Sequence, residues 1–188
     1  MDRLELEQRI LDKTIDPLEK YKDLWEYYYP RLLIYIKSFK KISGSEHTDI
    51  VSDILLKTFN NLHKYNQLYS LSTWIYNIAK NYALDLYRKT NPSILAFSDD
   101  AVDEQAVNAG EQDSMVDAII QNDLIEKCRE CIKSLHEKDK RLVFLRYYEG
   151  LNSKEISLIE GVSRSAVRRR LMVVKSHIKK LLGDDYGH

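Results

Sequence analysis

Glycine and proline are scarce along this chain, which has six glycines and three prolines among its 188 residues. Chain breakers this sparse favour long helices over a sheet of short strands and tight turns. Apolar residues at spacings of three and four predict amphipathic helices that begin near Pro17, Thr48 and Ser72, with Thr48 and Ser72 as N-caps. The sequence therefore predicts an all-α fold.

Charge divides the chain into three parts. Residues 1–89 carry 14 basic and 12 acidic side chains, residues 90–126 carry nine acids and no Lys or Arg, and residues 127–188 carry 15 basic and eight acidic side chains. The formal net charge of zero therefore conceals net charges of +2, −9 and +7. Because residues 93–113 also lack apolar periodicity, we expect a flexible acidic linker there. Two small helical domains, residues 1–92 and 114–188, would flank it.

The strongest local pattern lies in the basic part. A helix from Lys138 to Tyr148 is followed by a capping box that begins at Asn152, a short helix, a turn at Gly161, and a long helix from Ser163 to about Leu182. This order predicts a helix-turn-helix. Residues 163–182 contain seven Lys or Arg and no acid. Such a helix fits the DNA major groove, so the basic residues predict DNA binding. The alternative is that they form an ordinary charged face exposed to solvent. The candidates for base contact are Arg164, Ser165, Arg168 and Arg169.

A second candidate surface mixes aromatic, amide and cationic side chains in the loop and helix of residues 65–89. Unpaired bases bind to aromatic platforms beside a basic groove, so this surface is typical of a protein that binds melted DNA. The alternative is that Trp74 and Tyr76 are ordinary core aromatics. The candidates are Tyr65, Asn66, Tyr69, Trp74, Asn77, Lys80, Asn81, Arg88 and Lys89.

Two stretches carry a family resemblance. Residues 49–59 (DIVSDILLKTF) and 72–89 (STWIYNIAKNYALDLYRK) resemble region two of bacterial extracytoplasmic-function sigma factors, a group associated with stress responses. Residues 142–151 (LVFLRYYEGL), with Lys154–Ile156 and Gly161–Val167, resemble their region four. The resemblance implies a sigma factor that binds core RNA polymerase and directs transcription initiation at chosen promoters.

The resemblance also implies roles for these parts. Region two would bind the clamp coiled coil of the largest polymerase subunit through Asp49, Asp53, Leu56 and Lys57. The loop and helix of residues 65–89 would capture the melted −10 element. Region four would read the −35 element as duplex and hold the flap of the second large subunit. The acidic linker would either mimic RNA in the polymerase channel or act as a plain tether, and an anti-sigma factor is the usual further partner.

Other functional classes have little support. No glycine-rich phosphate loop, H-E-x-x-H or G-x-S-x-G motif is present, so we expect neither an enzyme nor a cofactor. Cys128 and Cys131 lack the further ligands of a zinc site, and we expect no metal. We expect two small, partly buried helix residues, and a redox pair is the alternative. No apolar run reaches the roughly 20 residues that span a bilayer, and we expect a cytoplasmic protein without membrane insertion. The rival interpretations are a repressor or activator that uses only the helix-turn-helix, and an adaptor that sequesters an anti-sigma factor.

Overall fold

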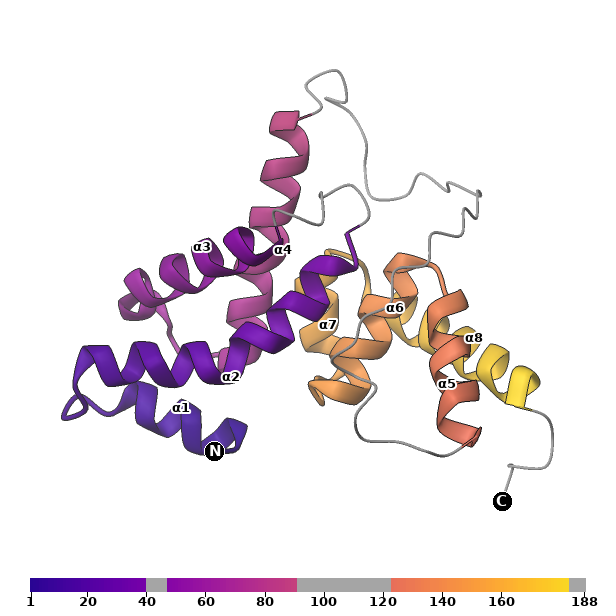
Figure 1. The fold of residues 1–188 in the computed structure, drawn as a ribbon, viewed down its shortest axis with the longest axis horizontal. Coiled ribbons are helices and arrows are strands. Elements are labelled where there is room, and N and C mark those ends of the chain that lie inside the picture. The colour runs from indigo at the N-terminus through magenta and orange to yellow at the C-terminus, as the bar shows by residue number, and fades with distance from the viewer. Residues whose placement is uncertain (40–46, 91–122, 183–188) are drawn as a thin grey trace.

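The computed structural model describes residues 1–39, 47–90 and 123–182, and each regular element in these ranges is helical (Figure 1). The first half, residues 1–90, comprises α1 (Arg3–Leu11), α2 (Pro17–Lys37), α3 (His47–Asn60), the short 3-10 helix η2 (Leu62–Lys64) and α4 (Leu71–Thr90). The second half, residues 123–182, comprises α5 (Asp123–Ser134), α6 (Glu137–Val143), the π-helical η3 (Phe144–Tyr148), α7 (Ser153–Glu160) and α8 (Arg164–Leu182). The all-α fold class is confirmed. The predicted linker 93–113 lies outside the described residues.

The N-caps in the first half are only partly as predicted. Helix α2 begins at Pro17 as expected, and the Asp16 side chain accepts a hydrogen bond from the Leu18 amide at 2.8 Å. The predicted cap at Thr48 is wrong, because α3 already begins at His47. The predicted cap at Ser72 is also wrong, for α4 begins at Leu71. Three hydroxyl residues lie within positions 70–73 at the start of α4, and pattern alone does not select among them.

The hydroxyl group that caps α4 belongs to Ser70. Its Oγ accepts from the Thr73 amide at 3.3 Å, whereas the Ser72 Oγ is buried and lies 2.9 Å from the Tyr28 hydroxyl. Ser72 therefore ties α4 to α2, and Ser70 stays at the surface end of the helix where the second half approaches.

Helix α1 is absent from the prediction above. Asp2 and Glu5 form a complete capping box at its start. Leu6 and Ile10, one turn apart, are buried against the other helices of the first half. The signal is present in the sequence as an Asp-x-x-Glu box followed by two apolar residues at a spacing of four, but the helix is short.

The helix-turn-helix is confirmed in detail. The Asn152 Oδ1 accepts from the Lys154 and Glu155 amides at 2.9 and 3.1 Å, and the Glu155 carboxylate accepts from the Asn152 amide at 3.0 Å. Gly161 ends α7 with φ +69°, a conformation that a side chain would strain. Ser163 caps α8 through the Ala166 amide at 3.1 Å. The predicted single helix 138–148 is divided into α6 and η3.

One apolar core runs through both halves. Side chains of α2, α3 and α4 form most of it, and the second half adds Leu142, Leu145, Ile156, Ile159 and Val167 to the same cluster. Helix α7 packs along α4 and also against α8, so it lies between the two halves (Figure 1). None of the described helices is both long and apolar enough to cross a membrane.

Candidate nucleic-acid and polymerase interfaces

The aromatic and amide candidates of the first half gather around one small pocket. Its cavity has a volume of about 90 Å³ and lies where the 65–70 loop meets the first turns of α4. Five of the predicted residues line it, together with Thr73 and with Leu158 of the second half: Tyr65, Asn66, Tyr69, Trp74 and Asn77. The structure thus brings together, from a loop and a helix, side chains that the pattern only placed near each other in sequence.

Tyr65 holds the pocket in shape. Its hydroxyl donates to the Tyr69 carbonyl oxygen at 2.8 Å and also lies against the Glu7 carboxylate. Its ring lies 5.5 Å from that of Trp74, centroid to centroid. Burial, together with the Glu7 carboxylate, raises the pKa of the Tyr65 hydroxyl well above its usual value, so the group stays neutral and donates. Tyr65 is therefore a supporting residue of the pocket, and only 9% of it is exposed.

The remaining candidates on α4 have different environments. Asn81, Arg88 and Lys89 are exposed along the outer half of the helix. Lys80 is only 6% exposed, and its ammonium group donates to the backbone carbonyl oxygen of Glu160 in the second half. In this arrangement Lys80 faces α7 rather than solvent.

The four candidates on α8 share one exposed face. Arg164, Ser165, Arg168 and Arg169 are all exposed, whereas Val167 on the opposite face is fully buried. The helix therefore presents its cations and its capped N-terminal turn outward, as the amphipathic pattern predicts. This geometry is compatible with insertion of the helix into a DNA groove.

The four candidates on α3 also form an exposed face. Asp49, Asp53, Leu56 and Lys57 are all accessible to solvent, and Leu56 is 50% exposed. The Tyr82 hydroxyl of α4 donates to the Asp53 carboxylate at 2.6 Å. This hydrogen bond, with some burial, raises the pKa of Tyr82 to about 12. Asp53 is therefore held in one orientation on the surface.

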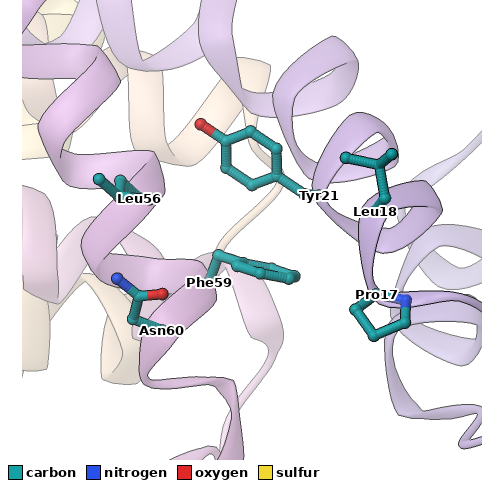
Figure 2. A pocket seen from close by; sticks show the side chains of 6 residues that line it. All are labelled: Pro17, Leu18, Tyr21, Leu56, Phe59 and Asn60. Atoms are coloured by element: carbon teal, nitrogen blue, oxygen red, sulfur yellow. The ribbon is translucent and has the colours of Figure 1, made fainter.

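An apolar groove lies next to this face (Figure 2). It has a volume of about 260 Å³ between the start of α2 and the end of α3. The Tyr21 and Phe59 rings meet edge to face at its base, with centroids 5.2 Å apart, and Leu18 is 75% exposed at its rim. The sequence patterns did not identify this groove, although Leu56 is one of its walls.

Helix α7 supplies the residues at the first-half surface that the prediction missed. Leu158 lines the pocket, Lys154 lies 5.6 Å above the Tyr69 ring, and Glu155 accepts from Ser70 and Thr73. The signal in the sequence is weak: Lys154 and Leu158, one turn apart, look like ordinary exposed residues of a short helix.

The described residues show no metal centre. No group of three or more His, Cys, Asp or Glu side chains among them is arranged to hold an ion. Cys131 is buried and free, and the Cys128 side chain lies outside the described part of the chain. His177 is exposed on α8.

Two family models match the chain. Residues 24–92 match Sigma-70 region 2, and residues 125–178 match Sigma-70, region 4. Together these segments cover more than half of the sequence, and they fall on α2 to α4 and on α5 to α8.

Whole-chain comparisons agree with the family models. The RNA polymerase sigma factor SigZ of Bacillus subtilis is 28% identical over 179 residues, which cover 89% of this chain and 93% of SigZ. The ECF RNA polymerase sigma factor SigW of the same organism is 24% identical over 143 residues, covering 74% of this chain and 76% of SigW.

Two solved structures share the fold. A sigma factor RpoE, in complex with the anti-sigma factor NepR from Bartonella quintana, is 17% identical, with a TM-score of 0.60 over 89% of this chain and 99% of that one. CnrH in complex with the cytosolic domain of CnrY is also 17% identical, with a TM-score of 0.54 over 98% of both chains.

The matched regions, the order of the two halves and the fold together define a transcription initiation factor. The chain belongs to the sigma-70 family of RNA polymerase sigma factors, in its extracytoplasmic-function group.

Proposed function

We propose that this sigma factor recognises a promoter in two chemically different ways, reading the −35 element as duplex and capturing the −10 element as unpaired bases. The observation that carries the proposal is the presence, in one chain, of an exposed basic helix and of a pocket lined by aromatic rings and amides. Neither surface alone accounts for both the basic residues of α8 and the aromatic and amide residues of the pocket.

The pocket supports capture of unpaired bases. Tyr69 and Trp74 supply aromatic surface, and Asn66 and Asn77 supply amide groups that can both donate to and accept from base edges. Stacking contributes roughly 1–3 kcal/mol per base. A few captured bases would thus hold open a short melted segment, while Arg88 and Lys89 would bind the backbone beyond it.

Helix α8 supports reading of a duplex. Arg168 and Arg169 lie within the first turns of the helix on the exposed face, where a guanidinium can fork onto guanine in the major groove. The exposed Lys175 and Lys179 further along would bind phosphates, which adds affinity without adding sequence information.

The α3 face and the adjoining groove would bind core polymerase. Leu56 belongs both to the predicted contact set and to the apolar groove of Figure 2, so the two features form one surface. We propose that the clamp coiled coil of the largest subunit lies across Asp49, Asp53, Leu56 and Lys57. The second half would hold the flap of the second large subunit. Because polymerase resides in the cytoplasm, the sigma factor would act there.

An anti-sigma factor is a further proposed partner. Both solved structures with this fold are complexes, one with the anti-sigma factor NepR and one with the cytosolic domain of CnrY. Since this chain has the same fold, a protein that covers its polymerase-binding or DNA-binding surfaces would regulate it in the same manner.

Transcription with purified core polymerase on a supercoiled promoter library tests the proposal. We expect initiation from a specific set of promoters that depends on this protein. Binding of duplex DNA with no effect on transcription would support the repressor instead. The absence of both activities would support the adaptor.

Single substitutions then separate the two surfaces. Asn77→Ala and Asn81→Ala should lower the permanganate reactivity of −10 thymines in the open complex while binding to core polymerase stays intact. Arg169→Ala should weaken recruitment to the promoter before opening. Lys22→Ala, an exposed cation on α2, is the matched control and should change neither step. Equal behaviour of all four variants would refute the assignment.

A further inference from the structure

Helix α1 lies before the residues that match Sigma-70 region 2, which begin at position 24. It packs on α2, and its buried residues Leu6 and Ile10 belong to the common apolar core. One of its carboxylates, that of Glu7, forms a hydrogen bond with the Tyr65 hydroxyl. This bond connects α1 to the loop of residues 65–70 (the −10 loop), which forms one side of the proposed base pocket.

The −10 loop carries backbone strain. Gln67 has φ +60° and is the one residue other than glycine with a positive φ in the described part of the chain. Residues other than Gly, Asn and Asp rarely adopt this left-handed region, and such a conformation persists only where surrounding contacts hold it. The Asn66 Oδ1 accepts from the Leu68 amide at 3.2 Å, but the Leu68 side chain is 73% exposed. The shape of the loop therefore depends on the contacts made at its two ends.

Tyr65 provides the contact that joins these ends. Its hydroxyl donates to the Tyr69 carbonyl oxygen at 2.8 Å, which closes the loop across Gln67. Its ring packs beside that of Trp74, at the start of α4. The same hydroxyl lies against Glu7, so α1 fixes the group that closes the loop.

We infer that Glu7 is a positioning residue of the proposed −10 surface: by fixing the Tyr65 hydroxyl it holds the −10 loop in the shape that receives an unpaired base. This inference rests on the proposed strand capture. Glu7 does not line the pocket, so it acts through Tyr65 alone. The strain at Gln67 and a hydrogen bond to a carboxylate are similar in magnitude, so loss of the bond lets the loop adopt other shapes. The affinity for an unpaired strand then falls with the fraction of molecules whose loop is held.

Three variants separate positioning from general support of the fold by α1. Glu7→Ala removes the carboxylate and leaves a good helix former in its place. Glu7→Gln keeps an acceptor oxygen at the same position. Asp23→Ala is the matched control, because the Asp23 Oδ2 accepts from the Arg9 Nε at 2.8 Å and thus ties α1 to α2 away from the pocket. The two alanine variants should lose similar amounts of thermal stability.

The first measurement uses holoenzyme assembled with core polymerase and a fluorescent single-stranded oligonucleotide that carries the −10 sequence selected in the promoter library. Glu7→Ala should bind it roughly two- to tenfold more weakly than the parent, whereas Glu7→Gln and Asp23→Ala should stay within about twofold of the parent. Affinity for a −35 duplex should be the same for all four proteins. Equal weakening by Glu7→Ala and Asp23→Ala would overturn the positioning role, because any loosening of α1 would then suffice.

The second measurement tests the link between Glu7 and the strained residue. Asn adopts the left-handed region more readily than Gln does, so Gln67→Asn lowers the strain that the Glu7 bond offsets. In the Glu7→Ala background, Gln67→Asn should recover most of the lost affinity for the oligonucleotide. In the parent it should change this affinity by less than about twofold. A general defect of α1 would not respond to a substitution in the loop, so the absence of recovery would overturn the positioning role.

The outcomes distinguish this role from strand capture itself. Unchanged binding of the oligonucleotide by Glu7→Ala holoenzyme would overturn the positioning role and leave the proposed function standing. No binding by the parent holoenzyme would overturn strand capture, and the role of Glu7 with it.

Discussion

The buried ion pair between α6 and α7 allows a sharp test of the packing. The Arg141 Nε lies 3.3 Å from the Glu160 Oε2, and the two side chains are only 7% and 6% exposed. The guanidinium also lies over the Phe39 ring at 4.4 Å. We consider three variants: Arg141→Met, Glu160→Met, and the double substitution.

The expected magnitude follows from desolvation. Removing one partner leaves the other charge buried without its counterion, which costs about 3–5 kcal/mol of unfolding free energy. That is a large fraction of the roughly 5–15 kcal/mol that a native protein has in total. For a chain of this size each kcal/mol lowers the melting temperature by about 2–4 °C. Each single variant should therefore melt about 6–20 °C below the parent.

The double variant should be more stable than either single one. Replacing both charges by apolar side chains removes the desolvation cost altogether, and such replacements are often neutral or stabilising. The loss of the Tyr35 hydrogen bond to Glu160 would reduce this gain by about 1 kcal/mol. The double-mutant cycle formed by the parent and these three variants should therefore show strong, non-additive coupling between Arg141 and Glu160.

Urea unfolding followed by circular dichroism at 222 nm gives the three free energies, and thermal scans give the matching temperatures. The linear dependence on urea should keep the same slope in all variants, since the surface exposed on unfolding hardly changes. Additive losses in the double variant, or single losses below about 1 kcal/mol, would refute the view that this pair is desolvated.

Three further predictions concern other parts of the structure. Burial raises the pKa of Glu149 despite the nearby Arg31. Protonated Glu149 therefore stabilises the fold fully below the usual glutamate pKa, and this stabilisation is lost as pH rises through the raised pKa of the folded state. Glu149→Gln should flatten this pH dependence of the unfolding free energy in urea titrations. Asn152→Ala should cost about 1 kcal/mol of unfolding free energy, because the α7 cap is lost. In duplex binding, Arg168→Ala should cost about 1–3 kcal/mol and relax specificity at one base pair, whereas Lys175→Ala should weaken all duplexes alike and lower the salt dependence.

Local signals in the sequence were sufficient for most of the helices. The capping box at Asn152, the glycine turn at Gly161 and the apolar stripe of Val167, Leu171 and Val174 all follow from spacings of one to four residues. The predicted caps at Thr48 and Ser72 were wrong because both helices begin earlier, at His47 and Leu71. At α4, Ser70 and Ser72 are both near the helix start, and tertiary packing decides between them, since the Ser72 hydroxyl is bonded to Tyr28. Short-range chemistry therefore predicts which elements exist better than where they begin.

For the candidate binding surfaces, the sequence predicted the types of residue involved but not how these residues are arranged in space. Loop and helix residues from Tyr65 to Asn77 proved to share one pocket, because a tight loop brings them together. The burial of Lys80 and the wall formed by Leu158 depend on contacts between residues about 80 positions apart, which no local pattern encodes. The apolar groove beside Leu56 likewise requires two helices to be placed next to each other.

The shared helix α7 has a consequence for the order of promoter contacts. It packs against α8 on one side and against α4 on the other, while the candidate DNA-contact residues of α8 are exposed. A duplex bound by α8 would therefore not require α7 to leave α4. Separation of the halves would expose the rings of Phe144, Tyr35 and Tyr76, which costs free energy in proportion to the apolar area exposed. A partner that differs in affinity for the two states must supply that free energy. If core polymerase binds the first half at α3 and the second half at a separate site, as proposed above, it would supply this free energy before any base is captured.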